Sequence, residues 1–404
     1  MKQITGGVCA PMGFRAAGIH CGVRKFKDKK DLSLIVSDAP AAAAAVYTRN
    51  LVRGAPIAVT KAHLADGYAR AAVVNSGIAN TCCAGGEAVA EEMCALAASA
   101  LGIAPADVIV ASTGVIGQPL DLTPIRAHMG ELVSKLSHDG SLSACQGIMT
   151  TDTRPKMAAV EFELGGKTCR IGGIAKGSGM IHPDLATMLV FLTTDAAISP
   201  AMLQKALSGD VETTFNLLSV DGDTSTNDMV SILANGLAGN PEIRAEGEDF
   251  AIFMEALNSV NVCLSRMIAG DGEGATKLLE CAVTGARNET AARKAARSVI
   301  SSSLVKAAMF GADANWGRVL CALGYAGADL DVGKVGVSFA SKAGSVTVCE
   351  AGAGVEFSED LARAVLSEDE IEIQVRLGDG DAAATAWGCD LSYDYVRING
   401  EYRS

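Results

Sequence analysis

The residues that could do chemistry in this chain gather around Thr187. Residues 176–195 run from a Gly-rich loop at 177–179, through Ala186 and Thr187, into the apolar run 188–192. That run is short and ends in Thr-Thr-Asp, which predicts a buried strand. If the bond between Ala186 and Thr187 were cut, Thr187 would carry a free α-amine beside its own hydroxyl. Such a pair is a nucleophile with its own base.

A threonine at the start of a strand is more often a β-forming residue than a catalytic one. Three features distinguish Thr187: Ala186 before it, the glycines behind it and Lys176 nearby. A small residue at 186 leaves room for the Thr187 hydroxyl to attack its own preceding carbonyl. An N-to-O acyl shift followed by hydrolysis would then free the amine. Self-cleavage is therefore a hypothesis that the sequence itself raises.

Two further sites place a polar side chain next to glycine. Thr113 and Gly114 follow the apolar run 107–111, where a strand is expected. They form either an ordinary turn after a strand or an oxyanion hole made of a hydroxyl and a backbone N–H. Glu273 stands between two glycines. It is either a solvated turn residue or a carboxylate directed at a substrate ammonium group.

Several other site classes fail on spacing. The sequence has no H-E-x-x-H, and its five histidines share no ligand spacing, so no metal site is expected. No serine lies in G-x-S-x-G, which argues against a hydrolase elbow. The glycines of 270–277 lack the G-K-[ST] ending of a phosphate-binding loop. Asp221, Asp223 and Asp228 do not have the spacing of a calcium-binding loop, and they are expected to cap their own turn.

Composition narrows the class of protein. The chain has 404 residues, of which 49% are hydrophobic and 20% charged, as in soluble globular proteins. Its formal net charge of -12 makes nucleic acid and anionic membranes poor partners. No apolar segment of membrane-spanning length and no secretory signal is found. The 12 cysteines form no C-x-x-C pair, so they are expected to be reduced in a cytoplasmic protein.

Hydrophobic patterning predicts strands and helices that alternate without a regular βαβ rhythm, and Gly165-Gly166 predicts a hairpin turn. The expected fold class is α+β, with large sheets packed against helices. Strands are expected at 33–36, 43–47, 72–76, 107–111, 157–164, 168–174, 188–192, 229–234, 335–339, 345–350, 355–357, 371–377 and 395–398. Helices are expected at 87–101, 122–136, 200–209, 248–268, 287–309 and 358–366.

Taken together and in order, several blocks make the chain resemble the bifunctional glutamate N-acetyltransferase/ornithine acetyltransferase family of arginine biosynthesis, nearly end to end. The blocks are 74–77 (VNSG), 111–117 (ASTGVIG), 148–152 (IMTTD), 186–189 (ATML), 221–228 (DGDTSTND), 271–277 (DGEGATK), 315–318 (NWGR), 386–390 (AWGCD) and 396–404 (VRINGEYRS). The chain departs from the family pattern at His182, Asp184, Leu185, Ile78 and Ser404, and none of these changes removes a catalytic group.

The resemblance implies a self-cleaving enzyme of the N-terminal-nucleophile type. Cleavage between Ala186 and Thr187 would give an α chain of 1–186 and a β chain of 187–404, which stay associated in an α2β2 heterotetramer. Thr187 would be the nucleophile, and Thr113 and Gly114 would form the oxyanion hole. The substrate-contacting positions implied by the family are Thr150, Lys176, Thr187, Glu273, Asn399 and Ser404.

The implied reaction transfers an acetyl group from N2-acetylornithine to glutamate, with no cofactor. Acetyl-CoA is a second acetyl donor in the bifunctional members, and the sequence does not decide whether this chain accepts it. Two other classes stay open. One is an aminopeptidase or amidohydrolase of the same self-cleaving kind, in which water resolves the acyl-enzyme. The other is a non-enzymatic binding protein with an intact chain.

Overall fold

The computed structural model describes residues 1–25, 28–182 and 188–401 of the chain. The chain divides into two compact units. Unit 1 comprises Met1–Gly177, Asp184–Glu212 and Thr224–Leu264, and unit 2 comprises Ser178–Pro183, Thr213–Asp223 and Ser265–Ser404. Each unit is thus assembled from three separate segments. The two units are defined by contacts in space. The expected α chain of 1–186 and β chain of 187–404 are defined by cleavage of a covalent bond, and that division stays a prediction.

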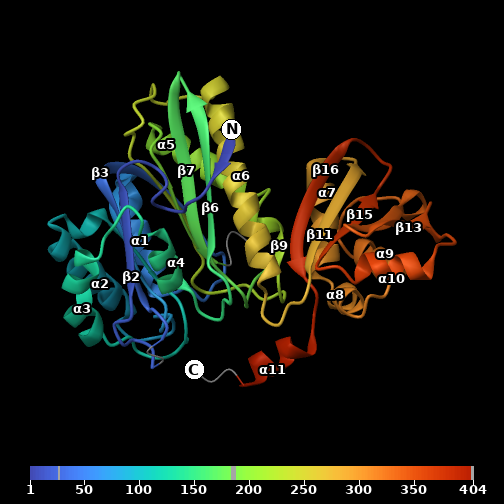
Figure 1. Cartoon of the computed structure of the whole chain (residues 1–404), viewed down its shortest axis with the longest axis horizontal. Coiled ribbons are helices and arrows are strands. Elements are labelled where there is room, and N and C mark those ends of the chain that lie inside the picture. The colour runs from blue at the N-terminus through green and yellow to red at the C-terminus, as the bar shows by residue number, and fades with distance from the viewer. Residues whose placement is uncertain (26–27, 183–187, 402–404) are drawn as a thin grey trace. The chain divides into compact units, whose positions relative to one another are not determined.

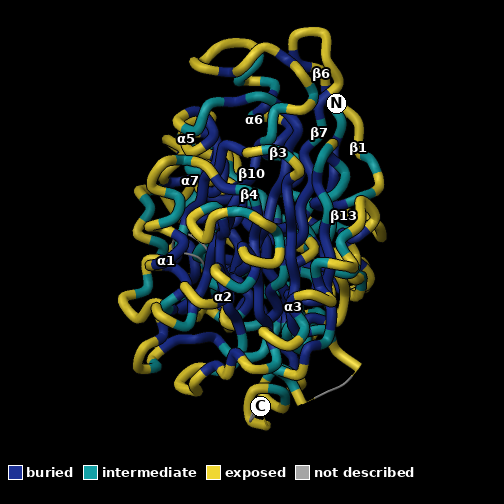
Figure 2. Tube along the Cα trace, turned by 90° about the vertical axis from the view of Figure 1, so that its left-hand side faces the viewer, coloured by how far each residue is buried: buried dark blue, intermediate teal, exposed yellow. Residues whose placement is uncertain are grey.

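Unit 1 is built on a mixed sheet of nine described strands (Figure 1). They are β1 (Lys2–Ile4), β2 (Phe14–Ile19), β3 (Leu32–Tyr47), β4 (Tyr68–Asn75), β5 (Val108–Ser112), β6 (Lys156–Leu164), β7 (Lys167–Lys176), β8 (Leu189–Thr194) and β10 (Met229–Ala234). Their order is β1-β6-β7-β8-β10-β3-β4-β5, and β2 pairs with β3. β3, β4 and β10 are buried along most of their length (Figure 2).

Helices cover both faces of this sheet (Figure 1). They are α1 (Ala55–His63), α2 (Gly86–Leu101), α3 (Thr123–Ser134), α4 (Ser141–Ile148), α5 (Pro200–Val211) and α6 (Glu248–Gly270), the last turns of which are grouped with unit 2. Side chains alternate between the faces of a strand. Leu32 and Leu34 of β3 therefore join the cluster under α2 and α3, whereas Ile35 joins the cluster under α4.

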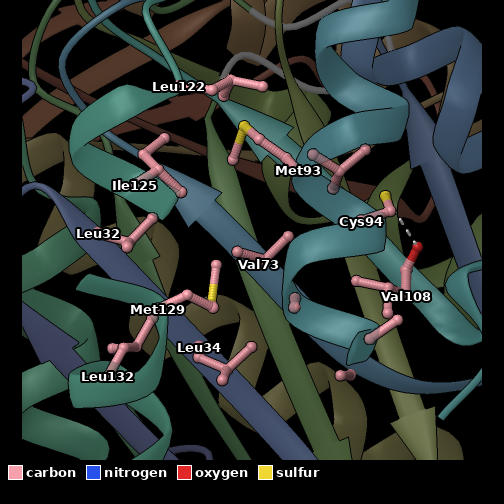
Figure 3. Packing of buried hydrophobic residues seen from close by; sticks show 14 of the residues in the cluster. Leu32, Leu34, Val73, Met93, Cys94, Val108, Leu122, Ile125, Met129 and Leu132 are labelled. Atoms are coloured by element: carbon pink, nitrogen blue, oxygen red, sulfur yellow. Dashed lines mark hydrogen bonds between the residues drawn. The ribbon is translucent and has the colours of Figure 1, made fainter. Parts of the chain in front are cut away.

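Figure 3 shows the first of these clusters, in which leucine, valine, isoleucine and methionine fill the space between α2, α3 and the sheet. Met93 from α2 and Leu132 from α3 are both fully buried there. On the other face, small residues let α4 approach the strands closely. A Cβ added at Gly147 would stand 2.1 Å from the Ser33 hydroxyl, and one at Gly18 would stand 2.1 Å from the carbonyl oxygen of Ser143.

Unit 2 contains a second mixed sheet, of seven described strands in the order β14-β13-β12-β15-β11-β16-β9. They are β9 (Leu218–Ser219), β11 (Leu278–Ala286), β12 (Gly336–Ser341), β13 (Gly344–Glu350), β14 (Ala353–Gly354), β15 (Glu370–Arg376) and β16 (Ala382–Cys389). Its helices are α7 (Glu289–Ser301), α8 (Ser303–Phe310), α9 (Trp316–Gly324), α10 (Glu359–Leu366) and α11 (Tyr393–Glu401). The alanines of α7 pack it against β11 and β16.

The α+β class is confirmed, and so are many of the expected elements. β10 has the predicted bounds, and β6 and β7 form the predicted hairpin. Gly165 and Gly166 turn that hairpin with φ of 53° and 73°, values that favour glycine. Gly102 ends α2 in the left-handed conformation, as a glycine after a helix commonly does. No described helix combines the length and apolarity needed to cross a membrane.

Other expectations were wrong in unit 1. The strands expected at 33–36 and 43–47 are one strand, β3, whose register with β4 shifts between Val36 and Ala41. A β-bulge of this kind lets a strand continue past Pro40. The helix expected to stop at Gly209 continues to Val211 in α5, because the buried side chains of Leu207 and Val211 hold its last turn.

Three expectations failed in unit 2. The helix expected over 287–309 is interrupted at Ser302, whose hydroxyl accepts a hydrogen bond from the Val305 N–H and so caps α8. The segment 355–357 is not a strand. The strand expected at 395–398 lies inside α11, because four residues with weak alternation do not distinguish a strand from a helix. β11, an interior strand of this sheet, and β16 beside it were not predicted.

Candidate active site

Thr113 and Gly114 form the turn that follows β5. β4 and β5 are parallel and end side by side, with Asn75 opposite Ser112. The Thr113 N–H donates to the carbonyl oxygen of Asn75 over 3.0 Å. Gly114 has a φ of 127°, and a Cβ there would stand 2.1 Å from the carbonyl oxygen of Gly77. Only glycine suits this position, because both the backbone angle and the close approach exclude a side chain.

The facing turn after β4 is fixed by the buried amide of Asn75. Its Oδ1 accepts hydrogen bonds from the N–H groups of Gly77 (3.0 Å) and Ile78 (3.2 Å), and its Nδ2 donates to the Ile78 carbonyl (2.9 Å). Within the described part of the chain, the Thr113 hydroxyl and the Gly114 N–H have no hydrogen-bond partner. Two neighbouring donors of this kind have the chemistry of an oxyanion hole.

A second buried amide, Asn227, ties this turn to β10. Its Nδ2 donates to the carbonyl oxygens of Ser112 (2.9 Å) and Ala79 (2.6 Å). Its Oδ1 accepts from the hydroxyls of Thr81 (2.5 Å) and Thr226 (2.6 Å). All the hydrogen-bonding groups of the side chain are therefore used. Asn227 thereby holds the carbonyl of Ser112, the residue before Thr113, against the start of β10.

Lys176, at the end of β7, lies in the same part of the sheet. The strand register places Lys176 opposite Leu189, and Leu189 opposite Met229. The Met229 N–H donates to the Met188 carbonyl over 2.9 Å. The end of β7 and the starts of β8 and β10 thus share one edge of the sheet. Ala186 and Thr187, the predicted cleavage site, lie outside the described residues.

Asp152 joins Thr150 to the loop that follows Lys176. Its Oδ2 accepts a hydrogen bond from the Thr150 N–H over 2.9 Å. Its Oδ1 accepts from the Gly177 N–H (2.8 Å) and from the Lys156 ammonium (2.6 Å). The side chains of this ion pair are 0% and 1% exposed. Asn227 therefore holds the turn of Thr113 and Gly114, and Asp152 holds Thr150 and the loop that follows Lys176. Sequence reasoning did not single out either of these buried side chains.

The charges in this region perturb one another. Burial would raise the pKa of Asp152, but Lys156, Lys176 and the Gly177 N–H lower it below its ordinary value. Burial lowers the pKa of Lys176, and the charges of Asp152 and Asp228 oppose that shift. Burial also raises the pKa of Asp228 well above its ordinary value, against the opposing charge of Lys176. Perturbed groups of this kind are typical of functional sites.

Asp152→Asn should destabilise unit 1 in a pH-dependent way. Removing one partner of a buried ion pair typically costs about 3–5 kcal/mol. Because the folded-state pKa of Asp152 is lowered, its stabilisation is complete above the unfolded-state pKa and is lost as pH falls through the folded-state pKa. Urea unfolding should therefore show a larger difference between variant and wild type at pH 7 than at pH 3.

Asp38→Asn is the matched control, because Asp38 pairs with Arg15 at the surface, where both side chains are 37% exposed. An exposed pair of this kind contributes about 0–1 kcal/mol. The free energy of unfolding should change by no more than that. Equal effects of the two substitutions would contradict the role assigned to Asp152.

Unit 2 holds two of the other predicted site residues, Glu273 and Asn399, and brings them into contact. Asn399 on α11 donates from its Nδ2 to the Glu273 Oε2 over 2.8 Å. The Glu273 N–H donates to the Ser178 carbonyl over 2.8 Å. A Cβ at Gly179 would stand 2.4 Å from the Glu273 carboxylate. Glu273 can therefore approach the Gly-rich loop only because residue 179 has no side chain. Ser404 lies outside the described residues.

Asp221 fixes the same loop from another side. Its carboxylate accepts hydrogen bonds from the N–H groups of Met180 (2.6 Å) and Ile181 (2.8 Å) and from the Tyr395 hydroxyl (3.2 Å). Burial, followed by the charges of Asp221 and Glu273, raises the pKa of Tyr395. Asp221 was predicted to cap its own turn, and it does accept a hydrogen bond from the Asp223 N–H over 3.3 Å. The sequence did not predict that Asp221 also links the Gly-rich loop to α11.

Every positioning residue found here lies inside one of the sequence blocks quoted above: Asn75, Asp152, Asp221 and Asn227. Membership of a block was the one signal that could have found them. Within the described residues, no group of three His, Cys, Asp or Glu side chains is arranged to hold a metal ion. The arrangement in unit 1 offers donors for an anion and buried charges of both signs.

Comparison with known proteins places the chain in a family. A model of the ArgJ family matches residues 15–404. The chain is 51% identical over 406 residues to the arginine biosynthesis bifunctional protein ArgJ of Symbiobacterium thermophilum, and the match covers 100% of both chains. It is 46% identical over 404 residues to the protein of the same name from Bacillus subtilis, covering 100% of this chain and 98% of the other.

Two solved structures are also similar over part of the chain. The arginine biosynthesis bifunctional protein argJ from Bacillus halodurans is 45% identical, with a TM-score of 0.49, covering 53% of this chain and 98% of the other. The ornithine acetyltransferase from Mycobacterium tuberculosis, solved with ornithine, is 37% identical, with a TM-score of 0.42, covering 45% and 96%. The family match and the full-length relatives confirm the resemblance found in the motifs. The chain belongs to the ArgJ family, the bifunctional enzymes of arginine biosynthesis.

Proposed function

We propose that this enzyme is an acyltransferase that moves the acetyl group of N2-acetylornithine to glutamate through an acetyl ester on Thr187. The observation that carries the proposal is the donor pair of Thr113 and Gly114, which Asn227 holds near the edge of the sheet where β8 begins. Family membership supports the same reaction. The name of the relative from Mycobacterium tuberculosis is that of an ornithine acetyltransferase.

The first half-reaction begins with the free α-amine of Thr187, which takes the proton from its own hydroxyl. The Thr187 Oγ attacks the acetyl carbonyl carbon of N2-acetylornithine, and negative charge develops on the carbonyl oxygen. The Thr113 hydroxyl and the Gly114 N–H receive that oxyanion. One such donor typically lowers the barrier by about 2.7–4 kcal/mol. Ornithine leaves with the returned proton, and the acetyl ester remains.

The second half-reaction transfers the acetyl group to the α-amine of glutamate and releases N-acetylglutamate. Lys176 supplies a positive charge for a substrate carboxylate, and Glu273 supplies a negative charge for a substrate ammonium. Thr150, Asn399 and Ser404 contribute further substrate contacts. The acetyl group passes directly between substrate and protein, so the proposal needs no cofactor. The α chain of 1–186 and the β chain of 187–404 would stay together in an α2β2 assembly.

Intact mass and N-terminal sequencing test the cleavage on which this reaction depends. We expect two fragments, 1–186 and 187–404, and a second N-terminal sequence that begins Thr-Met-Leu-Val. Without the cut, Thr187 has no free α-amine, and its hydroxyl has no adjacent base. A full-length chain that nevertheless transfers acetyl groups would contradict the proposal.

Assays of the purified protein with [acetyl-14C]-N2-acetylornithine should give ornithine and labelled N-acetylglutamate in equal amounts when glutamate is present. A parallel assay with acetyl-CoA and glutamate decides whether the second acetyl donor is used. Free acetate released at the same rate without glutamate would instead identify an amidohydrolase, in which water resolves the acyl-enzyme.

A further inference from the structure

Asp228 is a buried carboxyl group that the reaction above does not use. The residue is 3% exposed, and within the described part of the chain its Oδ2 has no hydrogen-bond partner. The side chain interacts with the Ser225 hydroxyl and with the charge of Lys176. A buried carboxylate oxygen without a donor is costly and uncommon in folded proteins. Such an atom therefore suggests that a donor arrives when the site is filled.

The position of Asp228 makes a substrate a suitable donor. The residue directly precedes β10, and its carbonyl accepts the Thr48 N–H over 3.1 Å. Met229, the next residue, lies opposite Leu189 and donates to the carbonyl of Met188, which directly follows residue 187 in sequence. Asn227, the preceding residue, binds the peptide of the oxyanion turn. Asp228 thus lies between Asn227, which holds the Thr113–Gly114 turn, and the start of β10, which pairs with the start of β8.

We infer that Asp228 is the base that deprotonates the incoming amino acid in the second half-reaction. The inference rests on the proposed function. Glutamate arrives as an ammonium ion, which has no lone pair for attack. One of its three N–H protons passes to the Asp228 Oδ2, and the resulting amine attacks the acetyl carbon of the ester. As the C–Oγ bond breaks, a second proton passes to the Thr187 Oγ, and the third remains on the amide nitrogen.

The surrounding charges suit this role. Burial lowers the pKa of Lys176, the negative charges of Asp152 and Asp228 raise it, and the positive charges of Lys156 and Arg24 lower it. Lys176 can keep a substrate carboxylate near while Asp228 takes the proton. Burial raises the pKa of Asp228, which makes its carboxylate a stronger base than one in water. In the first half-reaction the Thr187 amine removes the proton of the Thr187 hydroxyl. If Asp228 removes the proton of the glutamate ammonium, each proton has its own base.

Asp228→Asn tests the inference by separating the two half-reactions. Acetylation of the enzyme is followed as the burst of ornithine released from N2-acetylornithine without an acceptor. Transfer is then measured to glutamate and, separately, to hydroxylamine, which is mostly an uncharged amine at pH 7. Loss of a general base typically slows a reaction about 10²–10⁴-fold. We expect such a loss with glutamate, and rates within about 3-fold of wild type for the burst and for hydroxylamine.

Asp210→Asn is the matched control. Asp210 is a carboxylate of unit 1 that is 2% exposed, and its two oxygens accept hydrogen bonds from Asn258 (2.8 Å) and Asn261 (2.5 Å). This variant should leave the ratio of the glutamate and hydroxylamine rates unchanged. Asp228→Glu retains a carboxylate and should recover part of the glutamate rate that Asp228→Asn loses. That recovery provides a test even if the Asn variant folds poorly.

Equal losses with glutamate and hydroxylamine in Asp228→Asn would overturn the inference and indicate a structural role. Wild-type transfer to glutamate by Asp228→Asn would overturn it as well, as would failure of Asp228→Glu to recover any transfer. If wild-type protein releases no ornithine from N2-acetylornithine, the proposed function itself fails. That result is distinct from all of the others, because they require an active wild type.

Discussion

Thr187→Ala should abolish both cleavage of the chain and acetyl transfer. Alanine has no hydroxyl to attack the preceding carbonyl, so the N-to-O acyl shift cannot begin, and no nucleophile remains for the acetyl group. The variant should run as one full-length chain, and ornithine release should fall to the background of the assay. Denaturing electrophoresis and the ornithine burst measure the two losses on the same preparation.

Thr187→Ser is the informative companion, since it keeps a hydroxyl and, once cut, an α-amine. It should retain part of both activities, because a serine hydroxyl can make the same attack but lacks the methyl group that restricts the χ1 angle of threonine. Two fragments from Thr187→Ala would contradict self-cleavage at this bond. A completely uncut Thr187→Ser protein would show that the methyl group matters more than the hydroxyl.

Gly114→Ala should reduce kcat strongly with little change in KM for N2-acetylornithine. The added Cβ would stand 2.1 Å from the carbonyl oxygen of Gly77, and the φ of 127° disfavours alanine. The turn must move, which displaces the Gly114 N–H from the developing oxyanion. Removing one oxyanion donor typically costs about 10²–10³-fold in kcat. Steady-state kinetics on a variant shown to cleave and fold normally would measure the effect.

Gly117→Ala is the control for backbone strain. Gly117 also has a positive φ, of 80°, but an added Cβ would meet nothing within 4 Å. Its substitution should lower stability modestly, by about 1 kcal/mol, and leave kcat close to wild type. If Gly114→Ala and Gly117→Ala reduced kcat alike, the loss would come from general strain in the loop, and the oxyanion role of Gly114 would be contradicted.

The sequence by itself determined the elements whose signals are local. The two glycines of the β6–β7 hairpin, the glycine that ends α2 and the short apolar run of β10 each define an element within a few residues. The ordered blocks along the chain also determined the family, because their residue identities do not depend on the fold. Local patterns raised Thr113, Gly114, Lys176 and Glu273 as candidates, and the resemblance added Thr150 and Asn399.

Tertiary structure decided which side chains hold these candidates in place. Asn227 donates to a carbonyl 115 residues away, Asp221 accepts from an N–H 41 residues away, and Asp152 accepts from one 25 residues away. No local pattern encodes such pairings. Polar residues in Gly-rich loops satisfy ordinary turn rules equally well, and only the folded chain shows which distant backbone groups they bind.

The same limit explains the mistaken elements. Residues 395–398 carry too short a pattern to separate strand from helix, whereas in the structure Asn399 and Tyr395 of α11 bind Glu273 and Asp221. Packing also joined the two halves of β3 across Pro40, since the buried faces of that strand lie against helices on both sides. Local chemistry thus predicted the reacting groups, and long-range burial and hydrogen bonding determined how the candidates among the described residues are positioned.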